Sequence, residues 1–338
     1  MPIVSLFSKR TIRIVLAATA LLSRVVVAEA ATVYVAVNGV DGSSCGTSAS
    51  PCQTITTAIQ NAQPHDSVVV GPGTYRGERG APGCDCFLAV NKPVDLLSSD
   101  GAAATVIDAL AFQTATNVLV IADEAELGGP GKGFTITEAD AAGSAGIAID
   151  AKDVKIQGNQ VLNLANGLRT GGVGIITVES NPGPMLIAQN QVVGWQDGIL
   201  ARGANRTVAQ NAVSVGEDIG IELNGGIAKG NVVSGFSYAL SVGSDSTVIG
   251  NALRNSGVGI SAVDPFIGTI VRNDIVANFC GLANNNTGLP SITATSNYWG
   301  APTGPGPAPA DAVCAGAAAT VTAPFATAPL KVRVRIKP

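Results

Sequence analysis

The sequence predicts an all-β fold in which short strands are stacked coil upon coil, and three observations support this. An asparagine recurs at nearly regular intervals through the second half of the chain. The residue three places before each asparagine is apolar or small, and the residue two places after it is apolar. The 338 residues include 41 glycines, and only 13% are charged, which suits tight turns between strands better than a helical protein with a charged surface. The repeated asparagines are Asn159, Asn190, Asn211, Asn231, Asn251, Asn273 and Asn297.

A second repeated position, Gly-Ile or a close variant, fixes where each coil begins. It occurs at Gly146, Gly174, Gly198, Gly220, Ala239, Gly259 and Gly281. Each coil therefore contains three short strands, one starting at Gly-Ile, one running into the asparagine and one leaving it. With roughly 4.8 Å between stacked strands, about ten coils form a rod on the order of 50 Å long.

The asparagine column has a structural explanation. Backbone groups lose their partners in the plane of the sheet where a strand turns sharply. A stack of amide side chains can bond both to one another and to that backbone, because each amide has donors and acceptors. We therefore assign the column a structural role.

The termini and the overall charge restrict location and partners. Lys9, Arg10 and Arg13 precede an apolar run, and Ala28-Glu29-Ala30 fits a cleavage site, so we expect residues 1–30 to be a secretory signal peptide. No later segment is apolar and long enough to span a bilayer. The net charge of −4 gives no electrostatic reason to expect nucleic acid as a partner. We expect an exported monomer.

The N-terminal part predicts a cap for the open end of the stack. Residues 32–37 alternate like a strand, and Ile55, Ala58 and Ile59 share one face of a helix expected over residues 54–62. Further strands are expected at residues 67–70, 94–97, 105–107, 118–121 and 134–136. The expected organisation is a single domain with an N-terminal cap over residues 31–66, a β-helix over residues 67–300, and a C-terminal cap and tail over residues 301–338.

Six cysteines in an exported chain indicate disulfides. Cys45 and Cys52 flank a short loop and are expected to pair. Cys280 and Cys314 can join the last coil to the C-terminal segment. Cys84 and Cys86 are left, either as a tight bridge or, with Asp85, as part of a metal site, although the sequence offers no second ligand pair at metal-binding spacing. We predict no metal site there.

With these patterns in view, the chain resembles the right-handed parallel β-helix, or pectin-lyase-like, superfamily. One part of the resemblance is Val33-Tyr-Val, Cys45, Pro51-Cys-Gln-Thr-Ile55 and Asp66-Ser-Val-Val-Val70, which look like an N-terminal cap and first coil. The Ile-x-x-Asn-x-Val repeat is a second part, and Asn297-Tyr-Trp-Gly300, which looks like a closing coil, is a third. The resemblance covers nearly all of the mature chain and implies the fold. It does not specify an activity, because this superfamily includes lyases, hydrolases, epimerases and adhesins.

The groove strand offers little catalytic chemistry. In enzymes of this superfamily the groove follows the outer face of the Gly-Ile strand, where alternation places Ala148, Ile176, Leu200, Glu222, Ser241, Ser261 and Ala283. Only Glu222 is ionisable, whereas a glycoside hydrolase needs two carboxyl groups. The arginines that could serve a lyase, Arg202 and Arg254 among them, are scattered around the coil.

The best candidate site is a patch for sugar rings. It combines aromatic faces with carboxylates at their edges, which suit the C–H faces and hydroxyls of sugars. Its members are Trp195, Asp197, Asp218, Glu222 and Tyr238. Asp197 and Asp218 are expected in neighbouring coils, where a Ca²⁺ ion could lie between them. The alternative is that Trp195 packs inward and that both aspartates are turn residues.

We therefore expect an exported β-helix scaffold that binds carbohydrate or acts at the cell envelope, with no catalytic constellation. The alternative hypothesis is a polysaccharide lyase or epimerase acting on uronate-containing glycans. No cofactor is firmly implied, and Ca²⁺ is the one candidate ion.

Overall fold

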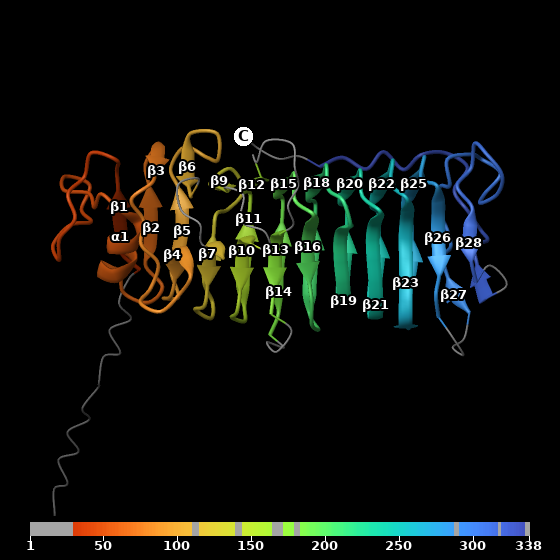
Figure 1. The fold of residues 1–338 in the computed structure, drawn as a ribbon, viewed down its shortest axis with the longest axis horizontal. Helices are drawn as coiled ribbons and strands as arrows, with labels where there is room; N and C mark the ends of the chain where they lie inside the picture. Colours follow the sequence, from red (N-terminus) through yellow and green to blue (C-terminus); the bar gives the residue numbers. More distant parts are fainter. Residues whose placement is uncertain are drawn as a thin grey trace, which may run out of the picture.

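The computed structural model describes residues 30–109, 115–138, 144–163, 172–178, 183–286, 291–316 and 319–334. They form an elongated stack of parallel strands whose coils follow one another along the long axis (Figure 1). The expected signal peptide lies outside the described residues, apart from Ala30. A regular coil contributes one strand to each of three faces, named here the first, second and third sheets in the order in which the chain enters them.

The first sheet begins at the Gly-Ile position. Its strands are β4 (Cys86–Val90), β7 (Thr116–Val120), β10 (Ala145–Ile149), β13 (Val173–Thr177), β16 (Asp197–Ala201), β19 (Ile219–Lys229), β21 (Tyr238–Ile249), β23 (Val258–Phe266), β26 (Cys280–Asn284) and β28 (Val313–Ala315). β19 and β21 are long because they bend and continue into the second sheet.

The second sheet runs into the asparagine column. Besides the ends of β19 and β21, it contains β1 (Thr32–Val35), β2 (Ser67–Val70), β5 (Asp95–Ser98), β8 (Glu126–Leu127), β11 (Val154–Gln157), β14 (Met185–Ala188), β17 (Arg206–Ala209), β24 (Thr269–Val271), β27 (Ile292–Thr293) and β29 (Thr320–Val321).

The third sheet leaves the asparagine column and leads back to the first. Its strands are β3 (Gly73–Tyr75), β6 (Thr105–Asp108), β9 (Thr135–Glu138), β12 (Gln160–Asn163), β15 (Gln191–Val193), β18 (Ala212–Ser214), β20 (Val232–Ser234), β22 (Ala252–Arg254) and β25 (Asp274–Val276). The register aligns like residues, so Val192, Val213 and Val233 pair on successive coils.

The helix α1 (Ile55–Asn61) lies at the N-terminal end of the stack, as predicted (Figure 1). It is one residue shorter at each end than expected, because Thr54 is the N-cap, whose side chain accepts from the Thr57 N–H, and Ala62 is the C-cap. Ile55 and Ile59 are buried against the first strands. β1 pairs in parallel with β2, and β28 and β29 continue two sheets beyond residue 300, so the stack is longer than residues 67–300.

The asparagine ladder is confirmed. All seven asparagines are fully buried. The Asn190 Oδ1 atom accepts hydrogen bonds from the Asn159 backbone N–H and amide, at 3.0 and 3.2 Å. The Asn190 amide donates in turn to the Ile156 carbonyl and to Asn211 Oδ1, at 2.9 and 3.1 Å. The same pattern repeats from coil to coil up to Asn297, so the ladder satisfies backbone groups at the turn between the second and third sheets.

A second, shorter ladder lies in the turn that leads from the third sheet into the first, which we call the entry turn. The Ser256 N–H donates to Asn278 Oδ1 at 3.1 Å, and the N–H and amide of Asn278 both donate to Asp311 Oδ2, at 3.0 and 2.8 Å. The backbone N–H of Phe236 donates to the Ser256 hydroxyl at 3.4 Å. The earlier coils carry the buried aromatic residues Trp195 and Phe236 at this inward-facing position, whereas the later coils carry the polar residues Ser256 and Asn278.

The cysteines form three disulfides. Cys45 pairs with Cys52 and Cys280 with Cys314, as predicted. For Cys84 and Cys86 the sequence left two possibilities open, and the structure joins them to each other.

The segment after β29 runs back along the third sheet, and we call residues 322–334 the strap (Figure 1, dark blue). The Ala326 N–H donates to the Asn297 carbonyl at 2.9 Å, and the Leu330 N–H donates to Asp274 Oδ1 at 2.8 Å. Asp274 is on the outer side of β25 yet wholly buried, because the strap covers it. The strap therefore connects the C-terminal end of the chain to an earlier coil.

Candidate functional site

The outer face of the first sheet has the composition that alternation predicts. Leu200, Glu222, Ser241, Ser261 and Ala283 align on successive strands, and the isoleucines and leucines that precede them face the core. Glu222 is the one ionisable side chain of this aligned column. The column therefore consists mainly of small and apolar groups, with the charged Glu222 on β19.

Asp197, Asp218 and Glu222 are brought together near β19. Asp197 begins β16, and its Oδ1 atom accepts from the Ile219 N–H at 3.0 Å. Burial raises the pKa of Asp197, and the charges of Asp218 and Glu222 add to this rise, while the Ile219 N–H and the Arg202 guanidinium oppose it. The influence of both carboxylates on Asp197 reflects their position on the neighbouring coil.

Arg202 joins this patch, which the sequence did not predict. Its Nε and Nη2 atoms donate to the two Glu222 carboxylate oxygens, at 3.2 and 3.1 Å. The arginines seemed scattered along the sequence, but the bend after β16 places this one beside β19. The paired geometry of guanidinium and carboxylate fixes both side chains on the surface.

Trp195 is not a sugar-stacking residue, so that prediction is wrong. Its side chain is 1% exposed, and its Nε1–H donates to the Val161 carbonyl at 3.2 Å. It lies five places after Asn190, and Phe236, five places after Asn231, is likewise buried. This position faces the inside of the entry turn, which was the alternative left open by the sequence.

Two other aromatic side chains are exposed at the entry turn. Tyr238, predicted as part of the patch, is 39% exposed, and Phe279 is 93% exposed. Tyr238 aligns with Val258 and Cys280 on the next two strands, so Phe279 lies two coils away, about 10 Å along the rod. On the coil before Phe279, the aligned position is Gly257.

Phe279 could have been found from the sequence by counting from the asparagine ladder. It lies six places after Asn273, one place further than the buried Trp195 and Phe236 lie from theirs. One step along the entry turn moves a side chain from the inside to the outside.

A shallow hollow flanks the patch on the side of the bend into the second sheet. It has a volume of about 190 Å³ and is lined by Glu222, Asn224, Ser241 and Asp264, among others. The polar surface therefore continues from the entry turn across β19 and β21 to this hollow.

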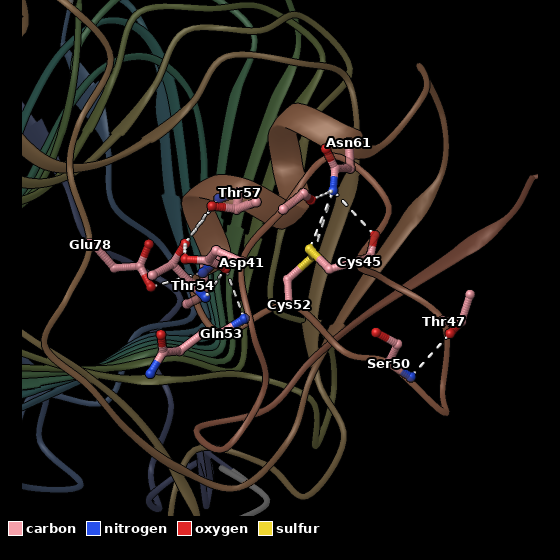
Figure 2. The surroundings of a disulfide bond; sticks show 12 residues. Asp41, Cys45, Thr47, Ser50, Cys52, Gln53, Thr54, Thr57, Asn61 and Glu78 are labelled. Atoms are coloured by element: carbon pink, nitrogen blue, oxygen red, sulfur yellow. Dashed lines mark hydrogen bonds between the residues drawn. A yellow bond between two sulfur atoms is a disulfide. The ribbon is translucent and has the colours of Figure 1, made fainter.

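Among the described residues, one group of potential metal ligands gathers within 4.8 Å: Asp41, Cys45 and Cys52. Both sulfur atoms are used in the disulfide. The Asp41 carboxylate accepts from the Gln53 and Thr54 N–H groups, at 2.8 and 2.9 Å, and from the Thr54 hydroxyl at 2.9 Å (Figure 2). The cluster therefore fixes the loop before α1. The Ca²⁺ site between Asp197 and Asp218 stays a prediction.

The comparisons with known proteins agree with this fold. Residues 37–82 match a family model described as a protein of unknown function. The crystal structure of pectate lyase Pel9A is similar with a TM-score of 0.57 and 13% identity, over 88% of this chain and 80% of that one. The mannuronan C-5 epimerase A-module from Azotobacter vinelandii gives a TM-score of 0.34 and 15% identity, over 73% of this chain and 74% of that one. The pectate lyase match shows the right-handed parallel β-helix fold alone. A comparison with curated proteins gives no match.

One family model covers more than half of the chain, from residue 121 to residue 306, and includes the ladder, the entry turns and the exposed patch. The chain therefore belongs to the family whose model is described as periplasmic copper-binding protein (NosD).

Proposed function

We propose that this chain is an exported scaffold that binds an extended glycan along the entry turns and the outer face of the first sheet. The observation that carries this proposal is the exposure of Tyr238 and Phe279, two coils apart at the entry-turn edge of the first sheet. The cap segments at residues 31–66 and 301–338 would protect the two ends of this surface.

The aromatic spacing supports a chain-like ligand. A sugar ring presents C–H groups on its face, and these pack on an aromatic ring while the hydroxyls at the edge bond to polar groups. Two platforms about 10 Å apart along a straight rod suit alternate rings of an extended glycan. A compact ligand would contact only one platform.

The groups needed for hydroxyl recognition lie beside the platforms. The Tyr238 N–H donates to the Asp218 carbonyl at 2.8 Å, so the exposed Asp218 side chain is on the coil next to Tyr238. Ser241 and Glu222 are half-buried on the sheet below. Carboxylates and hydroxyls of this kind accept and donate hydrogen bonds to sugar hydroxyls.

Copper, which the family description names, does not fit the residues of this chain. Protein ligands for copper are imidazole, thiolate and thioether groups. The sequence has one histidine, two methionines and six cysteines. The cysteines are all in disulfides, Met185 is buried in the core, and His65 is in an exposed turn beside Glu124. No copper chemistry is proposed.

An extracytoplasmic location is part of the proposal, and the disulfides support it. Three disulfides persist in an oxidising compartment. In the part of the chain that the structure describes, no helix is long and apolar enough to cross a bilayer.

Affinity electrophoresis through gels containing different polysaccharides tests the proposal. We expect retardation by at least one glycan, and Phe279→Ala should weaken it about tenfold or more, because the ring is a binding surface without a packing role. Ile267→Ala is the matched control, since Ile267 is 61% exposed at a different turn. Equal retardation of wild type and Phe279→Ala on every glycan would refute the proposal.

The same samples test the lyase form of the alternative. A lyase creates an unsaturated product that absorbs ultraviolet light. Arg202, the cation of the patch, is already bonded to Glu222 through two atoms, which disfavours its use as a base. Appearance of the ultraviolet signal on polyuronates would replace the binding proposal with the alternative.

A further inference from the structure

We infer that the glycan carries free amino groups, so that the site selects a polymer of amino sugars over neutral and uronate-containing chains. This inference rests on the proposed function, and it follows from the charges around the two aromatic platforms.

The binding surface is strongly acidic. It comprises five passes of the chain over the first sheet and its flanking turns, at residues 195–205, 216–226, 236–246, 256–268 and 278–286, all of which the structure describes. These segments contain six acids and a single cation, Arg202. The acids are Asp197, Glu217, Asp218, Glu222, Asp245 and Asp264. The local excess of five negative charges exceeds the net charge of −4 of the whole chain.

The single cation does not neutralise the acids nearest the aromatic rings. Arg202 is bonded to Glu222, with side-chain exposures of 41% and 23%. Glu217 and Asp218 are exposed and have no ion pair or side-chain hydrogen bond within the described part of the chain. Their charges are therefore available to a ligand.

These two carboxylates lie on the coil next to Tyr238. The Ser237 N–H donates to the Glu217 carbonyl at 3.1 Å, and the Tyr238 N–H to the Asp218 carbonyl at 2.8 Å. Both carboxylates therefore lie one coil beyond Tyr238, on the side away from Phe279, where a glycan that covers both rings and extends past Tyr238 meets them. Asp245 and the acidic hollow lie on the opposite border of the surface, so acidic residues occur at both of its borders.

Electrostatics then decides the ligand class. A chain of uronates would bring a carboxylate close to these acids with each sugar, and like charges at such separations repel. Protonated amines on alternate or successive sugars would meet them with opposite charge. Because the groups are solvent-exposed, this preference should weaken as salt is added.

The test compares three hexasaccharides by isothermal titration calorimetry: β-1,4-linked glucosamine, its fully N-acetylated form and oligogalacturonate. We expect the glucosamine hexamer to bind at least tenfold more tightly than the acetylated one, with oligogalacturonate showing no binding. The Glu217→Gln/Asp218→Asn double variant should reduce the difference to threefold or less. The control variant, Asp123→Asn/Glu124→Gln, removes two adjacent acids from a distant coil, where they pair with Lys152 and His65, and it should keep the tenfold preference.

The possible results distinguish failure of the amine preference from failure of the proposed glycan binding. Equal or tighter binding of the acetylated hexamer or of oligogalacturonate, still lost in Phe279→Ala, would overturn the amine preference and keep the glycan site. Amine binding that falls equally in both double variants would show general attraction and also overturn the inference. No binding of any hexamer would also overturn the amine preference. The proposed function itself is overturned if, in addition, no polysaccharide retards the protein in the gels or the retardation is unaffected by Phe279→Ala.

Discussion

The inside and the outside of the entry turn are one residue apart along the chain, yet they follow different rules. Trp195 points inward and is 1% exposed, whereas Phe279 points outward and is 93% exposed. The inner side is determined by packing and hydrogen bonding with the adjacent coils, so a change there must affect stability. The outer side is free of those constraints, and its aromatic and acidic residues are therefore the part of the turn available for binding.

Removal of the inner indole gives the largest expected effect. Trp195→Ala would leave a cavity and remove the indole donor to the Val161 carbonyl, and we expect a loss of about 4 kcal/mol in the free energy of unfolding. Phe279→Ala, the corresponding change on the outer side of the turn, should alter the free energy of unfolding by less than about 0.5 kcal/mol. Urea titration followed by circular dichroism measures both. Similar losses in the two variants would remove the distinction between the two sides.

Loss of one asparagine from the ladder should give the second-largest decrease in stability. Asn190→Ala removes the acceptor for the N–H and amide of Asn159, together with the donor to the Ile156 carbonyl. We expect a cost of about 3 kcal/mol, because these groups are buried and lose their partners. Thermal melts followed by circular dichroism measure this cost. In the same experiment Gln191→Ala, which changes the half-exposed residue next to Asn190, should leave the stability nearly unchanged. A neutral Asn190→Ala would show that the ladder is dispensable.

The buried carboxyl of the entry-turn ladder predicts a pH effect. Burial raises the pKa of Asp311 above its ordinary 3.8, partly offset by hydrogen bonds from Asn278. The native state therefore keeps this proton longer than the unfolded chain, and the stabilisation present below pH 3.8 is lost as the pH rises through the native pKa.

Asp311→Asn cannot ionise, so its stability relative to wild type should increase from about pH 3 to pH 7. Urea midpoints measured across this range check the sign. Parallel profiles for the two proteins would show that Asp311 is not the group responsible.

The surface ion pair gives the smallest expected effect. Glu222→Gln breaks the charge pairing with Arg202, but both side chains are partly exposed, so we expect a stability change below about 1 kcal/mol. Differential scanning calorimetry measures it. A larger loss would show that this surface ion pair contributes to stability as the inward-facing residues of the entry turn do.

The sequence predicted the parts of the fold that repeat. The seven asparagines and the Gly-Ile positions predicted the three strands of each coil and the outward direction of Glu222, since a regular register makes every coil a copy of the last. The ladder of Ser256, Asn278 and Asp311 could not be predicted in this way, because the residue type changes at each step and the members are joined only by hydrogen bonds across coils.

The candidate site was predicted only in part. Asp197, Asp218, Glu222 and Tyr238 do lie together, because alternation and coil spacing determine their positions. Trp195 was misplaced, and Phe279 was missed, because a shift of one residue in a tight turn reverses the direction of a side chain and no periodicity marks it. Arg202 reaches Glu222 through the bend after β16, whose path depends on tertiary packing.

The strap changes how the rod should come apart. In a stack where each coil touches only its neighbours, the end coil can detach alone, and disruption then spreads inward one coil at a time. Here the Leu330 N–H is bonded to Asp274, 56 residues earlier, and Ala326 to Asn297. The last coils and β25 are thus tied into one cooperative unit, so fraying from the C-terminal end must release several coils together or none.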